Sequence, residues 1–437
     1  MFSYYFRLAL VSMRRNPILS ALMIAAIGLG IGASMTTITV NYVMSSNPIP
    51  HKSDDLYYVQ LDSWDPNNAA NEPNEPPDQV TWTDAMALMR DAPALRQGAQ
   101  AKSNLVLEPP GDDERPFMVL ARSNFADFFP MFDLPFLYGS GWDRDADEAR
   151  ELVVVLSREI NDRVFGGENS VGRTLRLGGQ HFRVVGVIDE WSPMPKFYDV
   201  TNGPFDEPEE IFIPFNTMVD FQFSRSGNTN CWKAVDGNGF DAFLRSECVW
   251  IQFWAELPSQ AERDEYMQFL NSYVEQQKAL GRFPRPMNNR LSNVMQWMEN
   301  QEVVDDDAQV MMWLSLMFLV VCLLNTVGLL LSKFLAKSHE IGLRRAVGAS
   351  RGQLFTQHLV ESATIGLAGG LLGLGLAWLG LRGIELLFGD MVDRMTNMDW
   401  VMVLAAIGLA IVSAIVAGLY PTWRACNVQP AAQLKSI

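Results

Sequence analysis

Four long apolar runs dominate this chain of 437 residues, and they set its architecture. They cover residues 18–43, 310–335, 359–381 and 401–420. Each is close to the roughly 20 residues that a helix needs to cross a bilayer. The first run is too long for the apolar part of a cleaved signal peptide, so we expect it to remain as a membrane helix. Residues 47–307, between the first and second runs, then form one large domain on one side of the membrane.

The charges of the chain divide in the same way. Residues 47–309 carry 22 Lys and Arg against 44 Asp and Glu, a net charge of −22, whereas the rest of the chain carries +6. Basic residues beside membrane segments stay on the cytoplasmic side, and they include Arg14, Arg15, Arg344 and Arg345. We therefore expect both chain ends in the cytoplasm and residues 47–307 outside. The acidic outer domain argues against a nucleic-acid partner, because phosphate binding needs basic surface.

The two ends of the chain differ in character. Residues 1–17 mix aromatic and apolar side chains with arginines, a pattern typical of an amphipathic helix on the cytoplasmic membrane surface. Residues 421–437, which begin at Pro421, are predicted to be a cytoplasmic tail.

The loop at residues 337–352 (KSHEIGLRRAVGASRG) joins the second and third runs and contains a predicted short helix at 340–347. Gly348 can adopt the left-handed conformation at the end of that helix. Ser350 and Gln353 have the spacing of a capping box for the next helix. A helix with both apolar and basic surface in this loop is well placed to contact a soluble partner. The open alternative is a basic loop that only fixes the orientation of the chain.

Small residues recur in two of the apolar runs, which favours close helix packing. The glycines concerned are Gly28 and Gly32 in the first run and Gly366, Gly369, Gly370 and Gly373 in the third. Because four helices make a poor closed conduit, we expect a dimer with these helices at or near its contact. The alternative is that the glycines face lipid. Charged residues are rare within the runs, and Glu361 lies close to the cytoplasmic end, so we predict no ion or proton pathway.

The outer domain alternates short strands and helices, which predicts an α+β module. Residues 190–258 lack clear periodicity, so we interpret them as an insertion or second subdomain within a core of about 47–189 and 259–307. This insertion contains Cys231 and Cys248, which are predicted to form a disulfide because the domain is exported. Two free thiols remain the alternative. Gly166, Gly167 and Gly172 are predicted to occupy tight turns.

Sequence motifs for catalysis and for metal or nucleotide binding are missing from the chain. No phosphate-loop motif occurs, so ATP and magnesium are expected to bind a separate ATPase subunit. The four histidines are too scattered to predict a metal site, and the acidic residues at 143–147 lack the later ligands of a calcium loop. We expect no enzymatic activity and no cofactor in this chain.

The segment EIGLRRAVGASR, followed by QHLVESATIGLAGGLLGLGLA, resembles the signature of FtsX-like permeases in the MacB-type branch of ABC transporters. The first span, the C-terminal segment and residues 124–189 are similar to that family as well. The resemblance implies four transmembrane helices and a large α+β periplasmic domain inserted between the first and second. It also assigns contact with the ATPase to the short cytoplasmic helix, at Glu340, Ile341, Gly342, Leu343, Arg344, Arg345, Ala346, Val347, Gly348 and Ala349.

The function implied by this resemblance is that of an inner-membrane permease which couples ATP hydrolysis in a partner subunit to export. The implied partners are a cytoplasmic ABC ATPase, a second permease copy or a related permease, a periplasmic adaptor and a TolC-like outer-membrane channel. Two alternatives stay open: lipoprotein release of the LolC/LolE kind, and FtsX-like signalling to a cell-wall hydrolase. The resemblance names no substrate.

Overall fold

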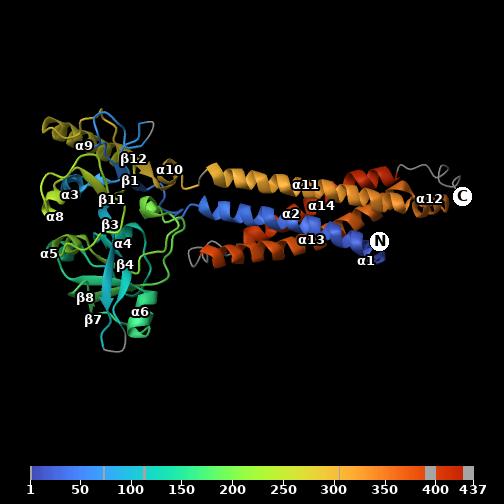
Figure 1. The fold of residues 1–437 in the computed structure, drawn as a ribbon, viewed down its shortest axis with the longest axis horizontal. Helices are drawn as coiled ribbons and strands as arrows, with labels where there is room; N and C mark the ends of the chain where they lie inside the picture. Colours follow the sequence, from blue (N-terminus) through green and yellow to red (C-terminus); the bar gives the residue numbers. More distant parts are fainter. Residues whose placement is uncertain (1, 72–73, 112–114, 305, 389–399, 427–437) are drawn as a thin grey trace. The chain divides into compact units, whose positions relative to one another are not determined.

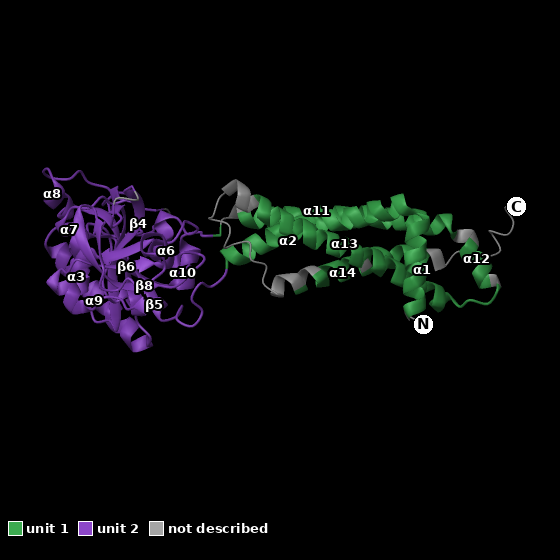
Figure 2. Cartoon of the chain, turned by 90° about the horizontal axis from the view of Figure 1, so that it is seen from below, with its two compact units in different colours: residues 1–45, 304–437 green, residues 46–303 purple. Residues whose placement is uncertain are grey.

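A computed structural model describes residues 2–71, 74–111, 115–304, 306–388 and 400–426. The chain forms two compact units, shown in Figure 2: residues 1–45 with 304–437, and residues 46–303. Residues 427–437 of the tail predicted at 421–437 lie outside the described residues.

The first unit is entirely helical in its described part (Figure 1). Four of its helices are long and apolar enough to cross a membrane, over residues 17–44, 308–336, 351–383 and 407–424. The fold therefore has four candidate membrane helices with the second unit between the first and the second, as predicted. The helices of this first unit are α1 (Phe2–Arg15), α2 (Pro17–Met44), α11 (Asp306–Ala336), α12 (Ser338–Ala346), α13 (Arg351–Phe388) and α14 (Trp400–Cys426).

Proline has a different effect at two places in this unit. Pro17 starts α2, where its missing N–H costs no helical hydrogen bond, and the non-helical backbone of Asn16 separates α1 from α2. Pro421, in contrast, lies inside α14, which continues to Cys426. The predicted end of the fourth helix at residue 420 is therefore wrong by six residues. A bilayer favours a continued helix, because neighbouring helices and local adjustments can satisfy the freed carbonyl group.

The second unit is built on one twelve-stranded mixed sheet. The strand order is β12-β1-β11-β3-β4-β9-β6-β8-β5, with β2 and β10 paired to β11 and β7 paired to β3 and β8. Only β4 with β9 and β6 with β8 run parallel among the described strands. The strands are β1 (Leu56–Gln60), β2 (Val80–Thr81), β3 (Arg96–Glu108), β4 (Phe117–Asn124), β5 (Phe136–Gly139), β6 (Val153–Ser157), β7 (Thr174–Leu177), β8 (Gln180–Ile188), β9 (Ile211–Pro214), β10 (Asn230–Cys231), β11 (Cys248–Glu256) and β12 (Arg290–Asn293).

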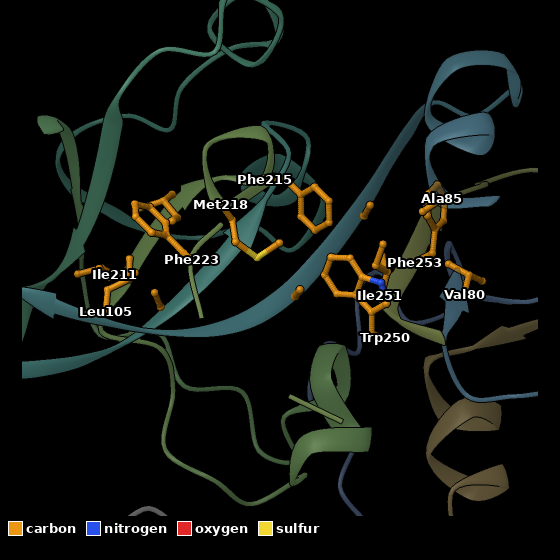
Figure 3. Close-up of a cluster of buried hydrophobic side chains, with 14 of the residues drawn as sticks. Val80, Ala85, Leu105, Ile211, Phe215, Met218, Phe223, Trp250, Ile251 and Phe253 are labelled. Atoms are coloured by element: carbon orange, nitrogen blue, oxygen red, sulfur yellow. The ribbon is translucent and has the colours of Figure 1, made fainter. Parts of the chain in front are cut away.

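Both faces of this sheet are buried, because alternate side chains along the strands enter two separate cores. In β11, Phe253 and Ala255 lie in one core and Trp254 in the other. Figure 3 shows part of the first core, where Phe215 lies beside Trp250 of β11 with ring centroids 6.0 Å apart.

Helices cover each face of the sheet. The first face packs against α3 (Trp82–Asp91), α6 (Arg158–Phe165), α7 (Phe215–Asp220), α8 (Phe240–Leu244) and α9 (Gln260–Ala279). The second face packs against α4 (Phe128–Met131), α5 (Arg144–Ala149), the 3-10 helix η1 (Phe197–Asn202) and α10 (Val294–Asn300). On the second face the ring of Trp297 stacks on Tyr58, with ring centroids 3.7 Å apart. The result is the predicted α+β domain.

Residues 190–258 do not form a separate subdomain, so that part of the predicted domain division is wrong. They supply β9, which lies between β4 and β6, and β11, which lies between β1 and β3. Every residue of β11 is buried. Because both faces of the strand are covered, its sequence shows no alternation of polar and apolar residues.

Local boundaries were predicted with mixed success. The capping box of Ser259 and Glu262 begins α9 as its sequence pattern indicates. For α3 the sequence predicts a helix over 83–89 with Thr83 as its N-cap, but the cap is Thr81, whose hydroxyl accepts from the N–H of Asp84. The three predicted turn glycines, Gly166, Gly167 and Gly172, all have positive φ angles, between 68° and 87°.

Candidate functional site

The short helix α12 lies between α11 and α13, where the sequence predicts a helical connection. Lys337 precedes it, and Gly348 follows it with a φ of 108°, a conformation that favours glycine. The backbone N–H of Gln353 then donates to the Ser350 hydroxyl over 3.2 Å, and the Gln353 side chain accepts from the Ser350 N–H over 3.1 Å. This capping box starts α13, so Gly348 and the box are local sequence signals for the turn between α12 and α13.

The predicted contact residues on α12 separate into an inner and an outer set. Ile341 is buried against the helical unit with Phe334 and Leu354. Arg344 donates to Glu340 over 2.6 Å and to Gln357 of α13 over 3.0 Å. These residues hold α12 against its own chain.

The outer set consists of two apolar side chains one helical turn apart. Leu343 is 57% exposed, and Val347, directly after α12, is 83% exposed. Residues four apart lie on the same side of a helix, so the two can contribute to one contact. An exposed apolar pair beside basic residues is suited to a protein partner, whereas Arg344 is already held within the chain.

A buried ionic cluster lies behind α12 and contradicts the expectation that the membrane helices lack buried charge. The carboxylate of Glu361 lies 2.8 Å from the ammonium of Lys333, and the two residues are 2% and 1% exposed. Ser12 donates to the same carboxylate, and His358 lies 3.6 Å from it. The sequence does show Lys333 and Glu361 as charged residues within two different apolar runs, but only the fold shows that they form a pair.

This cluster borders a cavity of about 60 Å³ between α1, α12 and α13. Lys337 and Arg344 line the cavity from the α12 side, and Ser12 and Glu361 line it from α1 and α13. The predicted contact helix and the N-terminal helix therefore meet at one place in the helical unit.

The predicted packing glycines bring α2 and α13 into close contact within one chain. A Cβ atom added to Gly373 would lie 2.9 Å from the Ile31 Cβ and 3.0 Å from the carbonyl oxygen of Gly28. A Cβ at Gly32 would lie 2.8 Å from the Cβ of Leu376. Gly369 meets Ile27 and Gly370 meets Ala410 in the same way, and Gly366 is buried in α13. These glycine surfaces are thus occupied by the same chain rather than left for a second copy.

Cys231 and Cys248 are bonded in the structure, with their Cα atoms 4.2 Å apart. They face each other across the antiparallel pair of β10 and β11. The bond therefore ties the segment before β11 to the centre of the sheet.

A second buried ionic network lies in the sheet domain. Arg122 of β4 donates to both Asp199 and Glu209, and Lys196 donates to Glu209 over 3.0 Å. Burial alone would raise the pKa of Glu209, but Arg122 and Lys196 hold it well below its usual value. The hydroxyl of Tyr198 completes the contacts of Glu209 at 2.7 Å. This network anchors residues 196–209 to the sheet.

A cavity of about 450 Å³ opens on the sheet domain between α3, α5 and α7. Its lining includes the apolar side chains of Met86, Met89 and Phe125 and the carboxylate of Asp147. Asp147 accepts hydrogen bonds from the N–H of Ala126 over 2.7 Å and from the Trp142 indole over 2.9 Å. Both donors are neutral, and burial raises the pKa of Asp147 to about 7.

Metal ligation has no geometric support in the described part of the chain. Across residues 2–71, 74–111, 115–304, 306–388 and 400–426, no three His, Cys, Asp or Glu side chains are grouped so that they could hold an ion. The carboxylates of Glu209 and Glu361 are paired with Arg and Lys side chains instead.

Four apolar helices, a large α+β domain between the first two, and a short exposed helix between the second and third define a membrane permease of two units. Two family descriptions cover most of the chain: "MacB-like periplasmic core domain" matches residues 20–268, and "FtsX-like permease C-terminal" matches residues 312–430. The chain belongs to this MacB-like, FtsX-like family of ABC transporter permeases.

Curated relatives agree with this assignment. The macrolide export ATP-binding/permease protein MacB of Bdellovibrio bacteriovorus is 25% identical over 68% of this chain and 41% of the relative. The pyoverdine export ATP-binding/permease protein PvdT of Pseudomonas aeruginosa is 25% identical over 72% of this chain and 42% of its own length. The chain thus spans about two fifths of these relatives. The uncharacterized ABC transporter permease YknZ of Bacillus subtilis is 19% identical to this chain. That match covers 98% of this chain and 98% of YknZ.

Two solved structures have a weak similarity to part of this chain. The periplasmic region of MacB from Actinobacillus actinomycetemcomitans has 14% identity and a TM-score of 0.36, covering 58% of this chain and 95% of that structure. The extracellular domain of YknZ from Gram-positive bacteria has 13% identity and a TM-score of 0.34, covering 55% of this chain and all of that structure.

Proposed function

We propose that this chain is the permease subunit of a MacB-type ABC transporter that transmits mechanical work across the membrane. A separate cytoplasmic ABC ATPase docks on α12 and moves it during ATP binding and hydrolysis. The movement passes along the helical unit to the domain at residues 46–303, which drives export of a substrate from the outer side of the cytoplasmic membrane. The observation that carries the proposal is the exposed apolar pair Leu343 and Val347 on an otherwise anchored helix.

The orientation of the chain follows from its charges. Arg344, Arg345 and Arg351 lie around α12, and basic residues beside membrane helices favour the cytoplasmic side. The strongly acidic domain then lies outside, in the periplasm of a bacterium with two membranes. There we expect a periplasmic adaptor and a TolC-like channel as further partners, and a second permease copy or a related permease to complete the transporter.

Docking through α12 is tested by replacing its outer residues. In the double variant Leu343→Glu, Val347→Glu we expect the ATPase to bind at least about tenfold more weakly, because two apolar contacts become buried charges. The measurement is co-purification of the ATPase with the full chain from the native membrane. Met118→Glu serves as the matched control, because Met118 is an equally exposed apolar side chain of the sheet domain. Full recovery of the ATPase with the double variant would contradict the proposed docking site.

A further inference from the structure

The ionic cluster behind α12 joins segments that are far apart in the sequence. Glu361 of α13 accepts a hydrogen bond from Ser12 of α1, 349 positions away. The same carboxylate oxygen lies 2.8 Å from the ammonium of Lys333, near the end of α11. The ammonium of Lys337, directly before α12, donates to the Ser12 hydroxyl over 2.5 Å and lies 4.0 Å from Glu361. One carboxylate thus links α1, the α11–α12 junction and α13.

Within the described part of the chain, only one side of the helix α1 is packed, through Ala9, Ser12 and Met13. Its backbone is not continuous with α2, because Asn16 is non-helical and Pro17 begins the next helix. Tyr4, Phe6 and Leu10 on α1 are exposed. Its inner side, in contrast, is buried at Ala9 and Ser12, and Ser12 is the polar contact with Glu361. Because a buried charge pair with added hydrogen bonds fixes geometry more strictly than apolar contact does, the cluster is well suited to set where α1 lies.

We propose that Glu361 is a positioning residue that clamps α1 to the α11–α12 junction, so that α1 and α12 move as one body. In Figure 1 α1 and α12 lie toward the same end of the helical unit. The clamp itself is independent of any partner. Its consequence, that an ATPase acting on α12 also moves α1, rests on the proposed function.

The clamp is tested first in the full chain alone, in lipid nanodiscs, by hydrogen–deuterium exchange. Removing only Glu361 would leave Lys333 as an unpaired buried charge, which can prevent folding. The double variant Lys333→Met, Glu361→Leu removes both charges and the acceptor of the Ser12 hydrogen bond. We expect the amides of residues 7–15 to exchange at least about tenfold faster in this variant, while the exchange of residues 46–303 stays unchanged.

Glu340→Gln is the matched control, because it breaks the half-exposed pair with Arg344 on α12 and leaves the buried cluster intact. Exchange of α1 in this control should stay within about twofold of the natural chain. If α1 exchanges equally in the natural chain and the double variant, Glu361 does not clamp α1 and the inference is overturned.

A second measurement uses the complex with the ATPase and separates the clamp from a simple structural role. In the natural chain, ATP should change the exchange of both α12 and α1. In the double variant the ATPase should still protect α12 and hydrolyse ATP, but the change at α1 should be lost. An ATP-dependent change at α1 that persists in the double variant would overturn shared movement. If the ATPase does not slow the exchange of α12 in the natural chain, the proposed function is refuted instead. The exchange of α1 in the chain alone would then still show whether Glu361 clamps α1.

Discussion

Asp147 couples the stability of the sheet domain to pH. Burial raises its pKa to about 7, whereas an unfolded aspartate titrates near about 4. The folded state therefore binds more protons between these values, and its stability falls as pH rises through this window. Between pH 5 and pH 7 this titration should lower the free energy of unfolding by about 2 kcal/mol, and we expect Asp147→Asn to abolish that decrease.

The measurement is denaturant unfolding followed by tryptophan fluorescence, since eight of the 12 tryptophans lie in residues 46–303. Glu148→Gln, at an exposed neighbouring carboxylate, should keep the pH profile of the natural chain. An unchanged profile in Asp147→Asn would show that this carboxylate titrates normally.

Arg122 is expected to be critical for stability in a way that surface arginines are not. Its guanidinium is fully buried between Asp199 and Glu209. Arg122→Met therefore removes the ion-pair partner that these two buried carboxylates share. We expect a loss of about 3–5 kcal/mol in the free energy of unfolding of the sheet domain.

The comparison is Arg183→Met, which breaks an exposed pair with Glu151 at 2.9 Å. It should cost less than about 1 kcal/mol, because water screens such pairs. Equal losses in the two variants, measured by the same fluorescence assay, would mean that the buried network adds nothing to stability.

Close packing of α2 on α13 decides the stability of the helical unit. Gly373 has no room for a side chain beside Ile31, whereas a Cβ at Gly375 would meet no atom within 4 Å. We expect Gly373→Val to destabilise the unit by about 1–3 kcal/mol through overpacking. Gly375→Val should have little effect, although it makes the same chemical change in the same helix.

The measurement is size-exclusion chromatography of the full chain in detergent after heating. The melting temperature is the temperature at which the monodisperse peak is lost. The melting temperature should fall in Gly373→Val alone. If the two valine variants have the same melting temperature, the glycines of α13 act through helix propensity and not through contact with α2.

Elements with a local signature were predictable from the sequence, and elements defined by distant partners were not. The boundaries of α9, for example, follow from a capping box and an apolar face. β11 gave no such pattern, because both its faces are covered. Its place between β1 and β3 depends on strands more than a hundred residues away, so the local sequence of residues 190–258 predicts an insertion or second subdomain and not a part of the same sheet.

At the scale of the whole molecule, the division into a helical and an α+β unit could be read from apolar runs and charge alone. The position of α12 was predicted as well, because Gly348 and the capping box of Ser350 and Gln353 are local signals for the turn that follows it. The cluster around Glu361 was not, since Ser12, Lys333 and Glu361 come from three separated segments. Arg344 is held by Glu340 and Gln357, whereas Leu343 and Val347 are exposed, which is why we propose these two for docking.

The account depends on work done at α12 reaching residues 46–303. The most direct test is hydrogen–deuterium exchange of the full chain with its ATPase in nanodiscs, with and without ATP. We predict that ATP changes the exchange of residues 46–303 in the natural chain, and that the change disappears in Leu343→Glu, Val347→Glu. Identical exchange with and without ATP in a complex that binds and hydrolyses it would contradict mechanical transmission.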